Sequence, residues 1–466
     1  MTDIGGVSAD TVTVHGGRPL AGPLRLAGFK HALVPLLAAS VLADRPVTIR
    51  NAPDIEDTRV LAEILRRLGA TVTFDHDTRV LTVDPAGLES GRIPTELTAR
   101  IHGVVYLMPV LLARIGRFTL AAPGGCRIGD RDRDGRRPLD HMLDVLRRFG
   151  AEVERTGHNT VTGECRALAG TTIDLAEYAA PAPHDGRPTG PLYSGATKTA
   201  LLAAAGATGT SVLRNPYPKP DVTELVAALA AAGVPVDARG DRIVVHGRGG
   251  LPGSFDHLLV SDLIETVTFA ACAVHLGQPL ELTNVTVDRL RHGLRPELEH
   301  LARMGVDLDW GPSTLRIEPP DTVRATDIVV ASHSVYSDSQ PFFALMLMRA
   351  GRSCTITESV WQDRSDYVTG LAELGGRVSA YGSTITMRPS RVHRGGRRVT
   401  ARDVRAAAVA VVAALGIEGP TTIDGVRHLA RGYEGLVAGL CDAGACIQYG
   451  APAARAAVGG EKGLLP

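Results

Sequence analysis

One pattern recurs six times along this chain of 466 residues. Each copy runs from an apolar helix through a β-branched strand and a turn to an amphipathic helix, which stops at a glycine before a second strand. The first copy reads LLAASVLADRPVTIRNAPDIEDTRVLAEILRRLGATVTF. Glycine suits these stops because helices often end in a left-handed conformation that glycine adopts without steric cost. The stop glycines are Gly69, Gly150, Gly233, Gly305, Gly375 and Gly444.

The spacing of the copies predicts how the chain is divided. The first three copies are longer than the last three, which indicates two domains of three repeats each. We expect the boundary near residues 253–259, just before the fourth copy. The apolar helices should lie inside with sheets packed over them, an α/β (α+β) arrangement. The turn-rich stretch Ala180–Gly190 is predicted to be a surface loop within the third repeat.

Composition excludes several classes of function. Lys plus Arg equals Asp plus Glu at 50 each, whereas a nucleic-acid-binding protein usually carries a basic excess. Six cysteines without a CxxC pair, and no histidines at zinc-ligand spacing, predict reduced thiols and no metal site. The N-terminus does not resemble a secretory signal, and the apolar runs are too short to cross a bilayer. We therefore expect a cytoplasmic protein without nucleic-acid or membrane partners.

Three residues interrupt the repeats in ways that suggest chemistry. Lys30 precedes an apolar helix, where an anion would be favoured, although an exposed lysine is the simpler interpretation. Cys126 follows two glycines in a charged stretch whose arginines should lower the thiol pKa, although charged runs are usually solvated loops. Asp338 precedes another apolar helix and could equally well be an ordinary N-cap.

Arginines form a second group of candidates. Arg364, Arg405 and Arg431 adjoin the starts of apolar segments, where a guanidinium is costly unless it meets an anion or a carboxylate. The stretch GPLYSGATKT resembles a phosphate-binding loop only loosely, because that motif requires adjacent Gly and Lys. We expect it to begin a helix instead.

Taken in this order, these residues resemble the enolpyruvyl transferase family over nearly the whole chain, from Gly17 to Tyr449. The resemblance is greatest to the branch that acts on UDP-sugars, which shares the PGGC loop and a following Arg-Pro-x-Asp. It implies a two-domain inside-out α/β barrel with three βαβαββ repeats per domain. The implied divisions are a strand segment at 1–28 that returns to the second domain, a first domain at 29–258, and a second at 259–466.

The resemblance also implies a reaction without a cofactor, in which the enolpyruvyl group of phosphoenolpyruvate moves to a hydroxyl of a uridine nucleotide. Residues implied in catalysis are Cys126, Asp338, Lys30 and Arg431. Residues implied in binding phosphoenolpyruvate are Lys30, Arg137, Arg364, Arg405 and Arg431, with Arg131 as the alternative loop arginine. Residues implied in binding the nucleotide are Arg137, Pro138, Leu139, Asp140, Tyr193, Ser194, Gly195, His31 and His102.

Three positions depart from the UDP-sugar branch. His31 stands where that branch has Asn, His102 where it has Arg, and Tyr193 where it has a small residue. These departures favour a smaller acceptor, uridine monophosphate attacked at its 3′-hydroxyl, as in the nikkomycin- and polyoxin-type antibiotic branch. The alternatives are a UDP-N-acetylglucosamine 1-carboxyvinyltransferase of peptidoglycan synthesis and an inactive binding paralogue.

Overall fold

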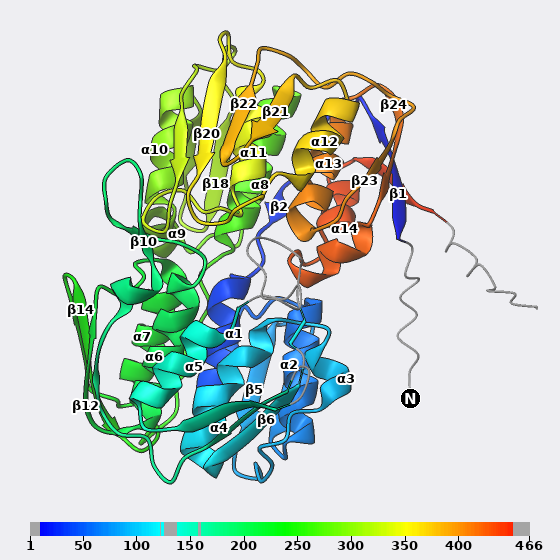
Figure 1. Ribbon diagram of the computed structural model, residues 1–466. Helices are drawn as coiled ribbons and strands as arrows, with labels where there is room; N and C mark the ends of the chain where they lie inside the picture. Colours follow the sequence, from blue (N-terminus) through cyan, green and yellow to red (C-terminus); the bar gives the residue numbers. More distant parts are fainter. Residues whose placement is uncertain (1–9, 122, 125–137, 157–159, 451–466) are drawn as a thin grey trace, which may run out of the picture.

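The computed structural model describes residues 10–121, 123–124, 138–156 and 160–450, which form two lobes joined at a narrow waist (Figure 1). The first lobe holds α1 to α7 and the strands from β3 to β15. The second lobe holds everything from α8 onward together with β1 and β2. This is the mixed α/β architecture with two similar domains that the sequence predicts.

The first lobe is built around largely buried helices that carry the apolar runs of the repeats. These inner helices are α1 (Lys30–Ser40), α4 (Leu107–Ile115) and α6 (Tyr193–Gly206). Amphipathic helices and short turns accompany them: α2 (Glu56–Arg67), α3 (Thr95–Thr98), η1 (Gly103–Tyr106), α5 (Asp140–Arg148), η2 (Leu175–Tyr178) and α7 (Pro220–Ala231).

Sheets cover the first lobe, and each follows the repeat pattern. In spatial order the first sheet is β15 (Asp256–Leu258), β3 (Val47–Arg50), β5 (Val80–Asp84) and β4 (Thr71–Asp75). The second is β6 (Arg117–Ala121), β8 (Thr160–Glu164) and β7 (Glu152–Thr156). The third is β13 (Val236–Arg239), β14 (Arg242–Arg248), β12 (Thr208–Arg214) and β9 (Thr172–Asp174). A small hairpin of β10 (Ala180–Pro181) and β11 (Pro188–Thr189) occupies the predicted loop.

The second lobe repeats this plan. Its inner helices α8 (Leu263–Leu276), α11 (Gln340–Leu347) and α13 (Val404–Leu415) contact one another. Its other helices are α9 (Val287–Gly293), α10 (Arg295–Met304), α12 (Asp366–Glu373), η3 (Val426–Arg431) and α14 (Leu436–Asp442). In spatial order, its first sheet is β17 (Asp307–Trp310), β18 (Thr314–Glu318), β16 (Leu280–Thr283) and β2 (Leu24–Arg25). Its second sheet is β19 (Ile328–Val330), β20 (Cys354–Glu358), β22 (Thr384–Met387) and β21 (Val378–Tyr381). Its third sheet is β23 (Arg398–Thr400), β24 (Gly419–Asp424), β1 (Thr11–Gly16) and β25 (Cys446–Tyr449).

The two lobes exchange strands. β1 pairs with β24 and β25, and β2 pairs with β16, so the start of the described chain belongs to sheets of the second lobe. In return β15 pairs with β3 of the first lobe. The two crossings run side by side, since Gly28 bridges Ser261 and the amide of Phe29 donates to the carbonyl of Val260 at 2.8 Å. The waist is therefore a pair of adjacent chain segments.

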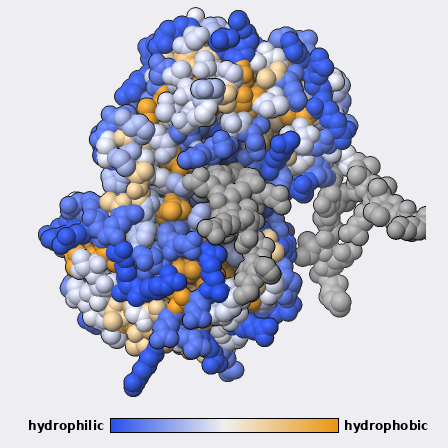
Figure 2. Space-filling model, in the orientation of Figure 1, coloured by the Kyte–Doolittle hydropathy of each residue, from blue (hydrophilic) through white to orange (hydrophobic). Residues whose placement is uncertain are grey.

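The stop glycines adopt the conformation for which the repeats predict them. All six have a positive φ, between 87° and 109°. The surface of both lobes is mostly hydrophilic in the view of Figure 2, and its apolar patches are small. No helix in the described part of the chain is long and apolar enough to cross a membrane.

Candidate active site

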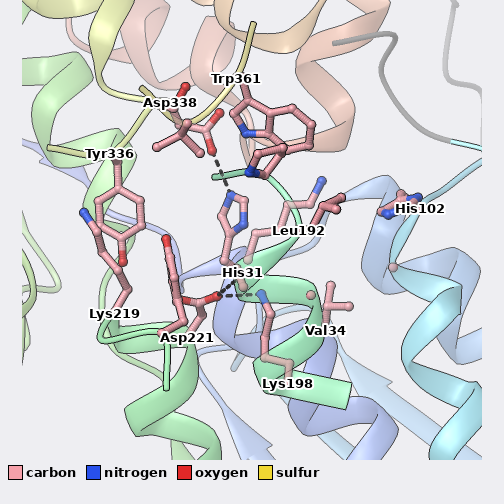
Figure 3. Close-up of a pocket in the computed structure, with 18 of the residues that line it drawn as sticks. His31, Val34, His102, Leu192, Lys198, Lys219, Asp221, Tyr336, Asp338 and Trp361 are labelled. Atoms are coloured by element: carbon pink, nitrogen blue, oxygen red, sulfur yellow. Dashed lines mark hydrogen bonds and ion pairs between the residues drawn. The ribbon is translucent and has the colours of Figure 1, made fainter. Parts of the chain in front are cut away.

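A cavity of about 250 Å³ lies where the two lobes meet (Figure 3). His31 and Lys198 reach it from α1 and α6 of the first lobe, whereas Asp338 and Trp361 reach it from loops of the second lobe. Because both lobes contribute to its lining, the shape of the cavity depends on how closely they approach each other.

Lys30 and Arg431 share one carboxylate at the cavity wall. Lys30 is the first residue of α1, and its Nζ lies 2.9 Å from Asp57 Oδ1 and donates to the carbonyl of Arg431 at 2.5 Å. Arg431 ends η3, and its Nε lies 3.9 Å from Asp57 Oδ2. Two cations from different lobes thus meet over a buried aspartate, an arrangement that suits a bound anion.

Asp338 contacts two arginines and a histidine. Its carboxylate forms a short ion pair with Arg364, lies 3.3 Å from Arg405 Nε, and lies 3.2 Å from His31 Nε2. Burial alone would raise the pKa of Asp338, but the charges of the two arginines hold that pKa well below its usual range. Asp338 does not act as the N-cap of α11, since Ser339 occupies that position. Its carboxylate is directed to the cavity instead.

Glu358 holds the turns that present these groups. It accepts hydrogen bonds from Ser337 Oγ at 2.6 Å, from the Val360 amide at 2.7 Å and from the Trp361 amide at 3.1 Å. Arg405 is fixed separately, because the N-cap Asp403 accepts a hydrogen bond from its amide at 2.8 Å. The segments of the second lobe that line the cavity are therefore held by hydrogen bonds to buried carboxylates.

A second polar wall comes from α6 and α7. Lys198 Nζ lies 2.5 Å from Asp221 Oδ2, and both side chains are buried. Lys219 donates to the Ser334 carbonyl, and its Nζ lies 3.7 Å from the centre of the Tyr336 ring. Burial lowers the pKa of Lys219. The wall thus links the first lobe to the segment that leads to Asp338.

The described lining has a positive balance. It contains six Lys or Arg residues and four Asp residues, a formal excess of two positive charges. A cavity with such an excess favours small anions, because charges lining a cleft are less screened than in bulk water.

Most of the residues that the sequence nominates come together here. Those that line the cavity are Lys30, His31, His102, Pro138, Ser194, Gly195, Asp338, Arg364, Arg405 and Arg431. Cys126, Arg131 and Arg137 lie outside the described residues.

Three nominated residues lie behind the lining or point away from it. Leu139 is buried just before α5, and Asp140 is exposed and pairs with Arg155 at 2.9 Å. Tyr193 is buried, and its hydroxyl donates to the carbonyl of Asn215 at 2.7 Å. Burial raises the pKa of Tyr193 to about 12. The hydrogen bond of its hydroxyl is therefore made within the first lobe.

The sequence interpretation missed Asp57, Lys198, Lys219, Asp221 and Trp361, all of which line the cavity. One signal was available, since a lysine inside the apolar helix α6 requires an anionic partner. The partner itself, Asp221 on α7, could not be identified without the packing of the two helices.

Comparisons with known proteins identify the family of this chain. The model of the EPSP synthase (3-phosphoshikimate 1-carboxyvinyltransferase) family matches residues 14–440. A UDP-N-acetylglucosamine 1-carboxyvinyltransferase of Halothermothrix orenii is 30% identical over 93% of this chain and 98% of its own length. UDP-N-acetylglucosamine 1-carboxyvinyltransferase 2 of Listeria monocytogenes is 29% identical over 94% of this chain and 97% of its own length.

Solved structures give the same result. The enolpyruvyl transferase NikO from Streptomyces tendae superposes with a TM-score of 0.88 and 39% identity, covering 94% of this chain and 98% of its own. EPSP synthase from Acinetobacter baumannii has the same fold, with a TM-score of 0.70 and 19% identity over 94% of this chain and 99% of its own. The chain therefore belongs to the EPSP synthase (3-phosphoshikimate 1-carboxyvinyltransferase) family and is an enolpyruvyl-transferring enzyme.

Proposed function

We propose that the enzyme transfers the enolpyruvyl group of phosphoenolpyruvate to the 3′-hydroxyl of uridine monophosphate and releases phosphate. The observation that carries this proposal is the cavity between the lobes, where Asp338 faces His31 among Lys30, Arg364 and Arg405. Such a site offers cations for a small dianionic or trianionic substrate and a carboxylate for an attacking hydroxyl.

Phosphoenolpyruvate would bind to the two groups of cationic side chains in the site. Its phosphate and carboxylate carry the negative charge, and arginine forks bind both kinds of group with two parallel hydrogen bonds. Lys30 and Arg431 form one such group around Asp57, and Arg364 and Arg405 form the other around Asp338. In this structure, Asp57 and Asp338 each balance the positive charge that the anionic groups of phosphoenolpyruvate would balance when bound.

The chemistry requires one proton to leave the acceptor and one to reach the substrate. The acceptor oxygen bonds to C2 of phosphoenolpyruvate while C3 gains a proton; C3 then loses a proton and the C2–O bond to phosphate breaks. We assign the acceptor proton to Asp338. Its paired arginines make it a weak base, so an anion that draws Arg364 and Arg405 away would raise its pKa toward a useful range.

The lining of the cavity supports a compact acceptor. Two imidazoles, His31 and His102, line it at positions where the UDP-sugar branch has an amide and a guanidinium. Neither imidazole reproduces the hydrogen bonds of the group it replaces. A nucleotide without the sugar therefore loses fewer hydrogen bonds to the protein than a UDP-sugar does.

A second candidate acceptor is UDP-N-acetylglucosamine. The names of the two curated relatives support it, because both are UDP-N-acetylglucosamine 1-carboxyvinyltransferases with near-complete coverage of this chain. These two relatives are 30% and 29% identical to this chain, whereas the enolpyruvyl transferase NikO is 39% identical, so the second candidate does not rest on the higher identity.

An acceptor screen tests the proposal. Phosphate release from phosphoenolpyruvate is measured with uridine monophosphate, UDP-N-acetylglucosamine, adenosine monophosphate and shikimate 3-phosphate, and the product is located on the ribose by NMR. We expect turnover with uridine monophosphate and an ether at the 3′ position. Efficient turnover of UDP-N-acetylglucosamine with none of uridine monophosphate would restore the second candidate. Equal turnover of adenosine monophosphate would reject recognition of uracil.

A further inference from the structure

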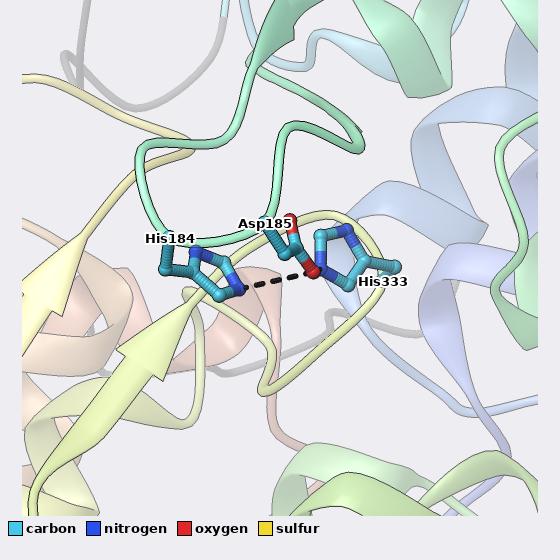
Figure 4. A group of neighbouring side chains, drawn as sticks. All are labelled: His184, Asp185 and His333. Carbon is cyan, nitrogen blue, oxygen red and sulfur yellow. Dashed lines mark ion pairs between the residues drawn. The ribbon is translucent and has the colours of Figure 1, made fainter.

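Away from the cavity, two histidines and an aspartate from different lobes meet at one point (Figure 4). His184 and Asp185 lie in the hairpin between β10 and β11 of the first lobe. His333 lies in the turn between β19 and α11 of the second lobe. Because His333 is distant in sequence from the other two, sequence spacing alone predicts no metal site here.

The three ligand atoms have the separations that a small cation needs. His333 Nε2 lies 2.9 Å and His184 Nε2 3.3 Å from the same Asp185 oxygen, and all three atoms lie within 4.8 Å of one another. Tetrahedral zinc, with bonds of about 2.0–2.2 Å, holds its ligand atoms roughly 3.3–3.6 Å apart. The cluster is therefore close to the spacing that one such ion requires.

His333 provides an independent observation. Its side chain is only 7% exposed, and its Nε2 pairs with Asp185 Oδ2 at 2.9 Å. Its Nδ1 has no hydrogen-bond partner among the described residues. This is unusual for a buried imidazole, because buried polar groups normally find partners. A metal ion would bind the nitrogen that points to Asp185.

Arg187 competes for the same carboxylate. Its Nε lies 2.8 Å from Asp185 Oδ2, the oxygen shared with both histidines, and its amide donates to Asp185 Oδ1 at 3.1 Å. In the absence of an ion, the guanidinium thus supplies the positive charge that balances Asp185. An ion at the cluster must displace this contact, so the identity of residue 187 should set the affinity.

We propose that His184, Asp185 and His333 form a site for a divalent transition-metal ion of the Zn²⁺ type, with solvent as the remaining ligand, that joins the two lobes. Histidine and carboxylate ligands with an open position are a common set for such ions. The neighbouring contacts continue toward the active site, since the Gly190 amide donates to Ser332 Oγ at 3.2 Å and Gly190 lines the cavity. The ion would hold the hairpin against the segment that leads to Asp338.

Calorimetric titration of the untagged full-length enzyme with Zn²⁺ tests this site without any assay of turnover, so its outcome is independent of the proposed function. We expect one Zn²⁺ per chain. His184→Ala and His333→Ala should each weaken binding about tenfold or more, in line with the effect of losing groups around a metal. Arg187→Ala should strengthen binding, because it removes the competing cation.

His246→Ala is the matched control, since His246 is an exposed histidine on β14 whose ring contacts Thr210 Oγ1 at 3.0 Å, within the first lobe. It should leave Zn²⁺ affinity unchanged. His184 is exposed in the hairpin, so His184→Ala keeps the test valid if His333→Ala impairs folding. The absence of stoichiometric binding, unchanged affinity in His184→Ala, or unchanged affinity in Arg187→Ala would each overturn the proposal.

Discussion

In the proposed mechanism, the chemistry depends most on the carboxylate of Asp338. It contacts Arg364, Arg405 and His31, and each of these contacts comes from a different segment of the chain. Replacing Asp338 by Asn keeps the shape but removes the charge. The proposed base is lost, and two buried guanidinium groups lose their partner, so this change should impair both substrate positioning and proton transfer.

We therefore expect Asp338→Asn to lower kcat by about 10²- to 10⁴-fold, the usual contribution of a general base. Steady-state phosphate release measures this, with circular dichroism as the check on folding. Asp256→Asn is the control, because Asp256 is half exposed and pairs with Arg50 at the surface. An Asp338→Asn enzyme with wild-type turnover would show that another group takes the acceptor proton.

Single residues could be nominated from the sequence where they adjoin an apolar helix. Lys30, Asp338 and Arg405 were found in this way, and the structure brings all three to one cavity. The method fails for groups whose partners come from packing, such as Lys198 with Asp221. The family resemblance, which nominated Asp140 and Tyr193, also cannot orient a side chain, and neither residue lines the cavity.

Elements were easier to predict than their partners. Apolar runs, amphipathic runs and stop glycines identify the helices, because these patterns depend on neighbours in sequence. Which sheet a strand joins is a long-range choice. Residue patterns alone do not show that β1 joins β24 or that β15 joins β3, and only the family resemblance indicated that the N-terminal segment returns to the second domain.

The contact between α8 and α13 should respond to pH. His275 Nε2 donates to the Ala413 carbonyl at 3.0 Å, and burial lowers the pKa of His275 to about 4. Between pH 6.5 and 4 the unfolded chain therefore binds a proton that the folded chain does not. Stability falls as the pH falls through this window, by up to about 3 kcal/mol for this group.

His275→Gln keeps a hydrogen-bond donor but cannot titrate. We expect the free energy of unfolding of the wild type to fall by about 2–3 kcal/mol more than that of His275→Gln between pH 7 and pH 4.5. Urea denaturation at the two pH values measures the difference, and His246→Gln should behave as the wild type. Parallel losses in wild type and His275→Gln would mean that His275 is charged in the folded state.

At the scale of the whole molecule, strand exchange makes each lobe depend on distant sequence. A fragment of residues 259–450 contains α8 to α14 but lacks β1 and β2. β25 pairs only with β1 among the described strands, and the β16 edge is open without β2. Val12 and Val14 of β1 are fully buried, so their absence also exposes the core beside α13.

The fragment 259–450 alone should therefore not fold, whereas the same fragment followed by residues 10–28 should. The join is geometrically simple because β25 and β1 are antiparallel neighbours, with Tyr449 opposite Val12 and the Gly450 amide donating to the Thr11 carbonyl at 2.9 Å. A short glycine-rich turn from 450 to 10 would close them into a hairpin. Circular dichroism melting and the dispersion of amide NMR signals distinguish the two chains. A fused chain with Val12→Asp and Val14→Asp buries two charges in the core and should remain unfolded; if it melts as cooperatively as the unmodified fusion, the returning strand is not what completes the lobe.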